Sequence, residues 1–148
     1  MARVRITRWN AEALLGLVPQ VLQAYGEQVA PQLQDSLKAV RYEWPLTTDQ
    51  GGDIVTYRNN GERVRSPRNI FDTGELARSQ TPPQVTSNSM RIAWTAPYSG
   101  EVLRGGYIVS RRNGNYIAPG RDWITPVVQA TPPEKFFVEE WRRLAQGQ

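Results

Sequence analysis

The chain has 148 residues, of which 39% are hydrophobic, and this length fits one domain with a single core. It contains neither cysteine nor histidine, which excludes disulfides, thiolate nucleophiles, Ser-His mechanisms and zinc sites built from Cys or His. The net charge of +4 is carried by arginine, because all but two of the 18 basic residues are arginines. Such a bias suits bidentate contacts with carboxylates or phosphates, and it is equally compatible with a basic surface that has no particular partner.

The sequence shows no membrane or targeting signal. No apolar run approaches the roughly 20 residues of a membrane span, and the opening MARVRITRWN lacks the apolar core of a signal peptide. We therefore expect a soluble protein made in the cytosol, with no membrane contact, no metal and no cofactor.

The N-terminal third predicts a basic arm followed by a long helix. Residues 3–8 alternate basic with other side chains, which predicts an arm or an edge strand over 1–9. Apolar residues then recur at three- and four-residue steps, which predicts a helix over 10–44. This apolar stripe comprises Leu14, Val18, Val21 (or Leu22), Tyr25, Val29, Leu33, Leu37 and Val40. Pro19 and Pro31 fall inside this pattern and each removes a backbone donor, so we expect a kink or break near one of them.

Residues 53–66 are typical of a β-hairpin. Asn60 and Gly61 tolerate the positive φ angles of a type I′ turn, which would set Tyr57 opposite Val64.

Residues 84–128 predict a sheet with a short helix. A strand over about 84–96 would place Met90, Ile92 and Trp94 on one face. A helix over 98–104 should come next, ending at the glycines 105 and 106, and a second hairpin should turn at 113–114.

The chain closes with a predicted helix over 133–146. Phe137, Trp141 and Leu144 form its apolar stripe. Its acidic residues come early and its arginines late, which complements the helix dipole. We predict one domain over 1–148.

The segment Asp72-Thr73-Gly74 permits two interpretations. An aspartic protease presents its catalytic carboxylate in this way, but it needs a second such loop from a two-fold partner and a return strand after the glycine. The residues after Gly74 are instead helix-forming, and Glu75 lies three residues after Asp72, the spacing of a capping box. We therefore interpret Asp72 and Glu75 as a helix cap worth about 1 kcal/mol and predict no catalytic residue.

Three stretches carry a resemblance to a known family. They are Asp72-Thr73-Gly74-Glu75-Leu76-Ala77-Arg78-Ser79, then Thr95-Ala96-Pro97-Tyr98-Ser99-Gly100-Glu101-Val102 leading to Gly105, then Pro119-Gly120-Arg121-Asp122-Trp123-Ile124-Thr125-Pro126-Val127. Their order resembles the small minor-tail, head–tail joining and tail-completion proteins of long-tailed bacteriophages. The resemblance covers roughly residues 10 to 146.

This resemblance implies an α+β fold, with a long N-terminal helix packed on a small, mostly antiparallel sheet with extended hairpins, and a short C-terminal helix. It implies a structural virion protein without catalysis, which forms a homo-oligomeric ring, commonly hexameric, at the head–tail neck or the top of the tail tube. Its partners would be neighbouring connector and tail-tube proteins, with transient contact with genomic DNA in the channel. The protein would be assembled in the host cytoplasm, and its role as tail terminator, tail-completion protein or connector stays open.

Arginines are the expected contact residues in such a ring. The candidates for inter-subunit or inter-ring contacts are Arg3, Arg5, Arg8, Arg58, Arg63, Arg65, Arg111 and Arg112. Two alternatives stay open: a nucleic-acid-binding module that uses the arginine-rich hairpins on phosphates, and a dimeric aspartic protease.

Overall fold

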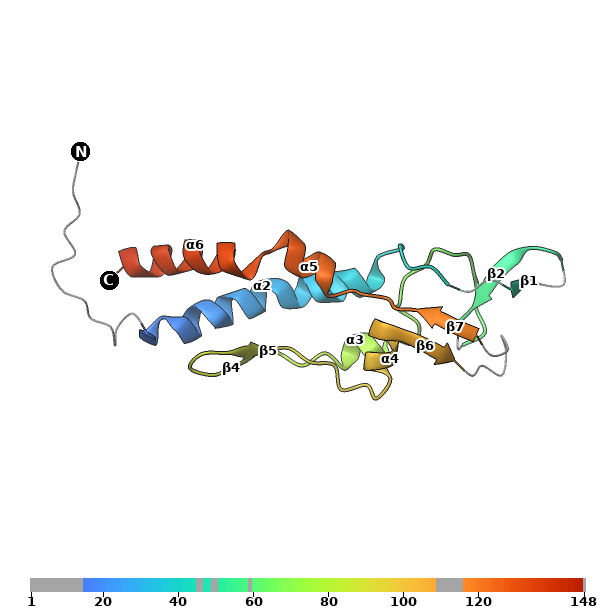
Figure 1. Ribbon diagram of the computed structural model, residues 1–148, viewed down its shortest axis with the longest axis horizontal. Coiled ribbons are helices and arrows are strands. Elements are labelled where there is room, and N and C mark those ends of the chain that lie inside the picture. The colour runs from blue at the N-terminus through green and yellow to red at the C-terminus, as the bar shows by residue number, and fades with distance from the viewer. Residues whose placement is uncertain (1–14, 45–46, 49–50, 59, 109–115, 148) are drawn as a thin grey trace, which may run out of the picture.

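The computed structural model describes residues 15–44, 47–48, 51–58, 60–108 and 116–147. The molecule is elongated, with helices α2 (Val18–Lys38) and α6 (Pro133–Gln146) side by side along one half and the strands of residues 54–64, 105–108 and 116–119 toward the other end (Figure 1). This arrangement confirms the predicted α+β fold with a long N-terminal helix, small antiparallel sheets and a short C-terminal helix. In the described part of the chain, no helix is both long and apolar enough to cross a bilayer.

Of the helix predicted over 10–44, residues 10–14 lie outside the described residues, and the C-terminal end is wrong because α2 ends at Lys38. The helical run is interrupted at Leu17, so the expected break lies beside Pro19, while Pro31 sits inside a continuous helix. Pro19 occupies the first turn, where its missing N–H costs no hydrogen bond. The helix ends at Lys38 because Ala39 turns to an extended conformation, which leaves Val40 68% exposed instead of in the apolar stripe.

The core lies along the buried face of α2. Its members come from α2, from positions between 42 and 96, and from α5 (Thr125–Ala130) and the residues just before it. The buried cluster comprises Tyr25, Val29, Leu33, Leu37, Tyr42, Ile70, Leu76, Ala77, Ala96, Trp123 and Val127. Trp123 is 1% exposed and meets Trp94 edge to face, with ring centroids 5.3 Å apart. The hydroxyl of Ser36 donates to the carbonyl of Trp123 at 2.7 Å, which ties α2 to this stretch.

The strands form three small antiparallel units. They are β1 (Thr47–Thr48), β2 (Ile54–Tyr57) and β3 (Arg63–Val64) in that spatial order, β4 (Gln84–Val85) with β5 (Met90–Arg91), and β6 (Gly105–Ile108) with β7 (Tyr116–Pro119). Both predicted hairpins are therefore confirmed as antiparallel pairs, the second with its tip outside the described residues.

The predicted strand over 84–96 is wrong, because the chain reverses within it. The turn lies between Thr86 and Ser89, where the amide of Thr86 donates to the Ser89 carbonyl at 2.8 Å and the Thr86 hydroxyl accepts from the Ser89 amide. The resulting β4–β5 hairpin runs along α2 (Figure 1). It passes so close that a Cβ at Gly26 would lie 2.6 Å from the Cβ of Pro83.

The helices α3 (Glu75–Arg78), α4 (Ser99–Arg104) and α6 complete the described part of the fold, together with α5. Helix α3 comes directly after the Asp-Thr-Gly segment, and α4 ends at Gly105, as predicted. Helix α6 has the predicted bounds, and Tyr25 holds it on α2, since its hydroxyl donates to the carbonyl of Thr131 at 2.9 Å and its ring lies 5.3 Å from that of Phe136.

Candidate assembly surface

The β2–β3 hairpin lies at one end of the molecule and turns over three residues. The amide of Gly61 donates to the carbonyl of Arg58, and the amide of Arg58 donates to the carbonyl of Glu62, both at 2.9 Å. Gly61 has φ 89°, whereas no described residue other than glycine has a positive φ. A type I′ turn needs two such residues, so the predicted turn is wrong and Gly61 serves as a bulge. The extra residue shifts the register by one, pairing Tyr57 with Arg63 instead of Val64.

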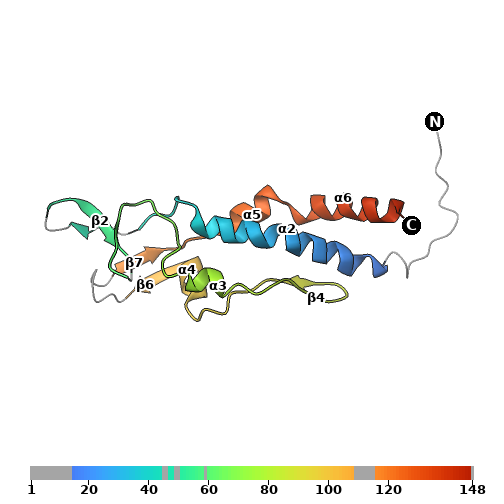
Figure 2. The same cartoon turned by 180° about the vertical axis from the view of Figure 1, so that it is seen from behind.

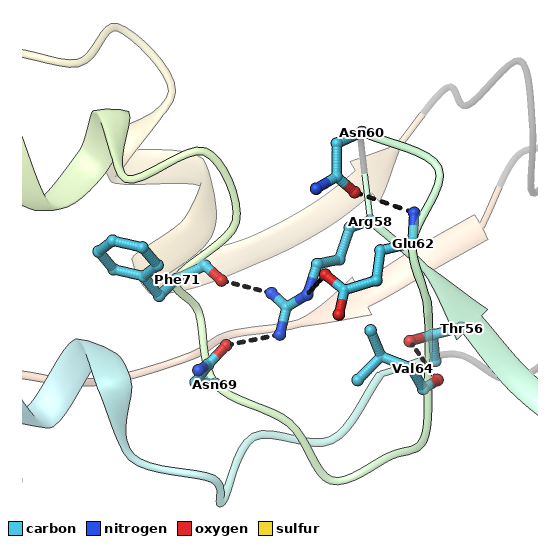
Figure 3. Close-up of polar contacts among 7 residues, drawn as sticks. All are labelled: Thr56, Arg58, Asn60, Glu62, Val64, Asn69 and Phe71. Carbon is cyan, nitrogen blue, oxygen red and sulfur yellow. Dashed lines mark hydrogen bonds and ion pairs between the residues drawn. The ribbon is translucent and has the colours of Figure 1, made fainter.

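Arg58 anchors this hairpin to the body of the protein (Figure 3). Its guanidinium donates to the side-chain oxygen of Asn69 at 2.9 Å and to the carbonyl of Phe71, and it lies 3.1 Å from the carboxylate of Glu62. The side chain is only 11% exposed. Arg58 therefore makes its contacts within its own chain, and little of its side chain is left for the inter-subunit contact expected of it.

The opposite face of the hairpin carries Tyr57, Arg63 and Arg65. The cross-strand pair Tyr57 and Arg63 shares one face, and Arg65 continues the alternation on that side. Arg63 lies 2.7 Å from the carboxylate of Asp53, in an ion pair whose side chains are 49% and 68% exposed. Arg65 is exposed and, within the described residues, makes no ion pair. Both arginines thus lie where a neighbouring molecule could reach them.

The remaining candidate arginines, Arg3, Arg5, Arg8, Arg111 and Arg112, lie outside the described residues.

The predicted capping role of Asp72 and Glu75 is wrong. Helix α3 begins after Gly74, which is its N-cap and has φ 78°, so Glu75 is the first residue of the helix and not the third, as a capping box requires. The amide of Glu75 instead donates to the Thr73 hydroxyl at 3.4 Å. Burial is the largest cause that raises the pKa of the Tyr98 phenol, and the charge of Glu75 and a side-chain hydrogen bond with it raise that pKa further. The left-handed glycine moves the helix start, so Glu75 turns toward Tyr98.

The chain after Gly74 forms a helix, as predicted, and not the return strand that a protease requires.

Asp122 is the carboxylate that holds a helix start. One of its oxygens accepts from the amides of Ile124 and Thr125, both at 2.9 Å, at the beginning of α5. Burial alone would raise the pKa of Asp122, but the hydrogen bonds from Thr125 and Ile124, together with the charge of Arg41, lower it overall. Sequence reasoning missed this cap. Its signal was an aspartate three residues before a threonine that precedes a proline.

A second feature that sequence reasoning missed is an indole between two arginines. The guanidinium carbons of Arg68 and Arg121 lie 3.9 Å and 3.7 Å from the ring centroid of Trp44. Two guanidinium groups at these distances would clash on one face, so we infer that they stack on opposite faces. The arginines are 5% and 6% exposed, so the stack contributes to the packing of the protein and is not a free surface.

An open groove of about 550 Å³ lies between α2, β4 and α6. Its lining includes Pro19, Gln23, Glu27, Val85, Glu140 and Leu144. The side-chain amide of Gln23 donates to Glu27 at 2.7 Å, and Glu140 pairs with Arg143 at 2.6 Å. The elements that form the groove lie at the opposite end of the molecule from the β2–β3 hairpin (Figures 1 and 2).

Across the residues that the structure describes, no cluster of three or more acidic side chains could hold a metal ion. Comparison of the chain with known protein families, with curated proteins and with solved structures finds no match.

Proposed function

We propose that this protein is a structural component of a tailed-bacteriophage virion. Copies of it assemble into a ring at the head–tail neck or at the top of the tail tube, and the ring joins or completes the tail around the DNA channel. The order of the three motifs that resemble head–tail joining and tail-completion proteins supports this role, and so does the shape of the molecule.

The observation that carries the proposal is an anchored projection. The β2–β3 hairpin lies at the far end of an elongated molecule (Figure 2), yet the guanidinium of Arg58, beside its turn and only 11% exposed, ties it to the body of the protein. A projection that is already ordered loses less conformational entropy when it docks. Its outer face carries Tyr57, Arg63 and Arg65, and tyrosine and arginine are enriched in protein–protein interfaces.

Strand edges add a second kind of contact. Within the described residues, β3 pairs only with β2, so the other side of β3 offers its backbone groups to a neighbour. When two different patches of identical copies meet, the same contact repeats from each copy to the next. The copies form a closed ring when the rotation between neighbours divides a full turn.

Native mass spectrometry of the purified chain over a range of concentrations tests the proposal. We expect one closed species whose mass is an integral multiple of 16.8 kDa. A protein that stays monomeric at every concentration contradicts it. DNA binding is measured in parallel, because a steeply salt-dependent affinity of the monomer for DNA would favour the nucleic-acid-binding alternative.

A further inference from the structure

We infer that neighbouring copies join hairpin to groove. The outer face of the β2–β3 hairpin of one copy, formed by Tyr57, Arg63 and Arg65, docks into the groove between α2, β4 and α6 of the next copy. The inference rests on the proposed ring and deepens it by naming the two surfaces that meet.

The charges of the two surfaces are complementary. The carboxylate of Glu27 is exposed and receives a hydrogen bond from the neutral amide of Gln23, while no described cation lies within ion-pair distance of it. The charge of Glu140 is matched by Arg143 of the same helix. The groove therefore keeps an excess negative charge, and the hairpin supplies exposed arginines, of which Arg65 has no acidic partner in the described part of its own chain.

The apolar part of the groove suits the remaining residue of the hairpin face. Pro19, Val85 and Leu144 are partly exposed and line the groove. Tyr57 is also partly exposed, and its ring can cover apolar side chains while its hydroxyl stays in water. Tyrosine and arginine are among the residues that most often dominate binding energy at interfaces.

The positions of the two surfaces decide between a head-to-tail and a two-fold contact. The hairpin and the groove lie at opposite ends of the molecule, so a copy that offers its hairpin to one neighbour keeps its groove open for another (Figures 1 and 2). A groove-to-groove dimer would bring two unmatched Glu27 carboxylates into one interface, which is unfavourable. The head-to-tail contact therefore fits both the charges and the ring.

A charge exchange in the full-length protein tests this contact. Arg65→Glu and Glu27→Arg are each expected to raise the concentration needed for assembly by about tenfold or more, and the double variant is expected to restore assembly. Lys135→Glu is the matched control, because it makes the same charge change as Arg65→Glu. Lys135 lies nine residues before Leu144 on α6, and at about 100° per residue it faces away from the groove. Circular dichroism confirms that each variant is folded.

Cross-linking provides a second readout that does not depend on a stable ring. The chain has no cysteine, so introduced thiols react on a clean background. Gln23→Cys in the groove and Asn60→Cys at the hairpin tip are mixed and treated with a short bis-maleimide. We expect a cross-linked dimer in this mixture, and much less when Gln129→Cys on α5 replaces the groove variant.

The outcomes separate the inference from the proposed function. If none of the charge exchanges disturbs assembly, the hairpin-to-groove contact is overturned, while the proposed ring still stands. A groove-to-hairpin cross-link no stronger than the Gln129→Cys control also overturns it. A wild-type chain that neither assembles nor cross-links contradicts the proposed function itself.

Discussion

Replacing Arg58 by methionine should destabilise the protein far more than the same replacement of Arg63. Both arginines belong to one hairpin and both form ion pairs, but the Arg58 side chain is 11% exposed and the Arg63 side chain is 49% exposed. Methionine keeps much of the apolar stem and removes the guanidinium. The loss at position 58 leaves the carbonyl of Phe71 and the side-chain oxygen of Asn69 without their donor (Figure 3).

The magnitude can be worked out from these contacts. Hydrogen bonds that involve a charged group contribute about 1.5–3 kcal/mol when they are buried, and those of Arg58 are partly hydrated, so we expect a total loss of about 2–3 kcal/mol. The exposed ion pair of Arg63 contributes about 0–1 kcal/mol, and its loss should be nearly silent. For a chain of this size, these values correspond to a fall in Tm of about 5–10 °C for Arg58→Met and at most about 3 °C for Arg63→Met.

Urea unfolding measured by far-UV circular dichroism compares both variants with the wild type, with thermal scans as a check. The reasoning is refuted if the two variants lose similar stability, or if Arg58→Met stays within about 0.5 kcal/mol of the wild type, the range typical of surface substitutions. Either result would mean that the guanidinium does not hold the hairpin to the body.

Three further predictions concern the body of the protein. Gly26→Ala should lose about 1 kcal/mol in urea unfolding, because a Cβ 2.6 Å from that of Pro83 costs about 1–3 kcal/mol of overpacking and outweighs the gain of about 1 kcal/mol in helix propensity. Gly16→Ala, where a Cβ meets nothing within 4 Å, should be neutral or stabilising. If both alanine variants changed the free energy of unfolding in the same direction, the packing argument would be contradicted. Trp44→Leu should cost about 2–4 kcal/mol by the same assay, since it removes a partly buried indole and both of its cation–π contacts, whereas Trp44→Tyr should cost less; similar losses would argue against the stacking. Asp122→Ala should lose about 1 kcal/mol at pH 7, from the loss of its hydrogen bonds at the start of α5. Because the folded pKa of Asp122 lies below 3.8, its contribution is fully present above that pH and is lost as the pH falls through the folded pKa, so the wild type and the variant should converge in acid denaturation; a constant difference would contradict this.

The parts of the fold that depend on local periodicity were predictable. The apolar stripe of α2 identified Tyr25, Val29, Leu33 and Leu37 as core residues, and the bounds of α6 were correct, because helical spacing over several turns leaves few alternatives. The end of α2 was misplaced because the residues after Lys38 continue the apolar pattern while the backbone does not.

The errors within the hairpins come from turn chemistry. Asn60-Gly61 correctly marked a reversal, but the sequence does not tell whether the glycine is part of a two-residue turn or a bulge after a longer one. A turn that is one residue longer shifts the register of the two strands by one residue. Tyr57 therefore pairs with Arg63, and the predicted pairing with Val64 was wrong.

The site was harder to predict because its decisive contacts join distant parts of the chain. Nothing local to Arg58 distinguishes an anchored guanidinium from a solvated one, since its partners Asn69 and Phe71 lie beyond the hairpin. The stack of Trp44 between Arg68 and Arg121 likewise depends on the tertiary fold. Asp72 is not the N-cap because Gly74 adopts the left-handed conformation and starts the helix itself. Glycine adopts left-handed and right-handed conformations about equally well, so the sequence did not reveal which one Gly74 has.

The measurement that tests the central claim most directly is negative-stain electron microscopy of the purified full-length chain, with class averages taken at several concentrations. Our account predicts closed rings of uniform diameter around a central opening. Isolated elongated particles at every concentration would contradict it.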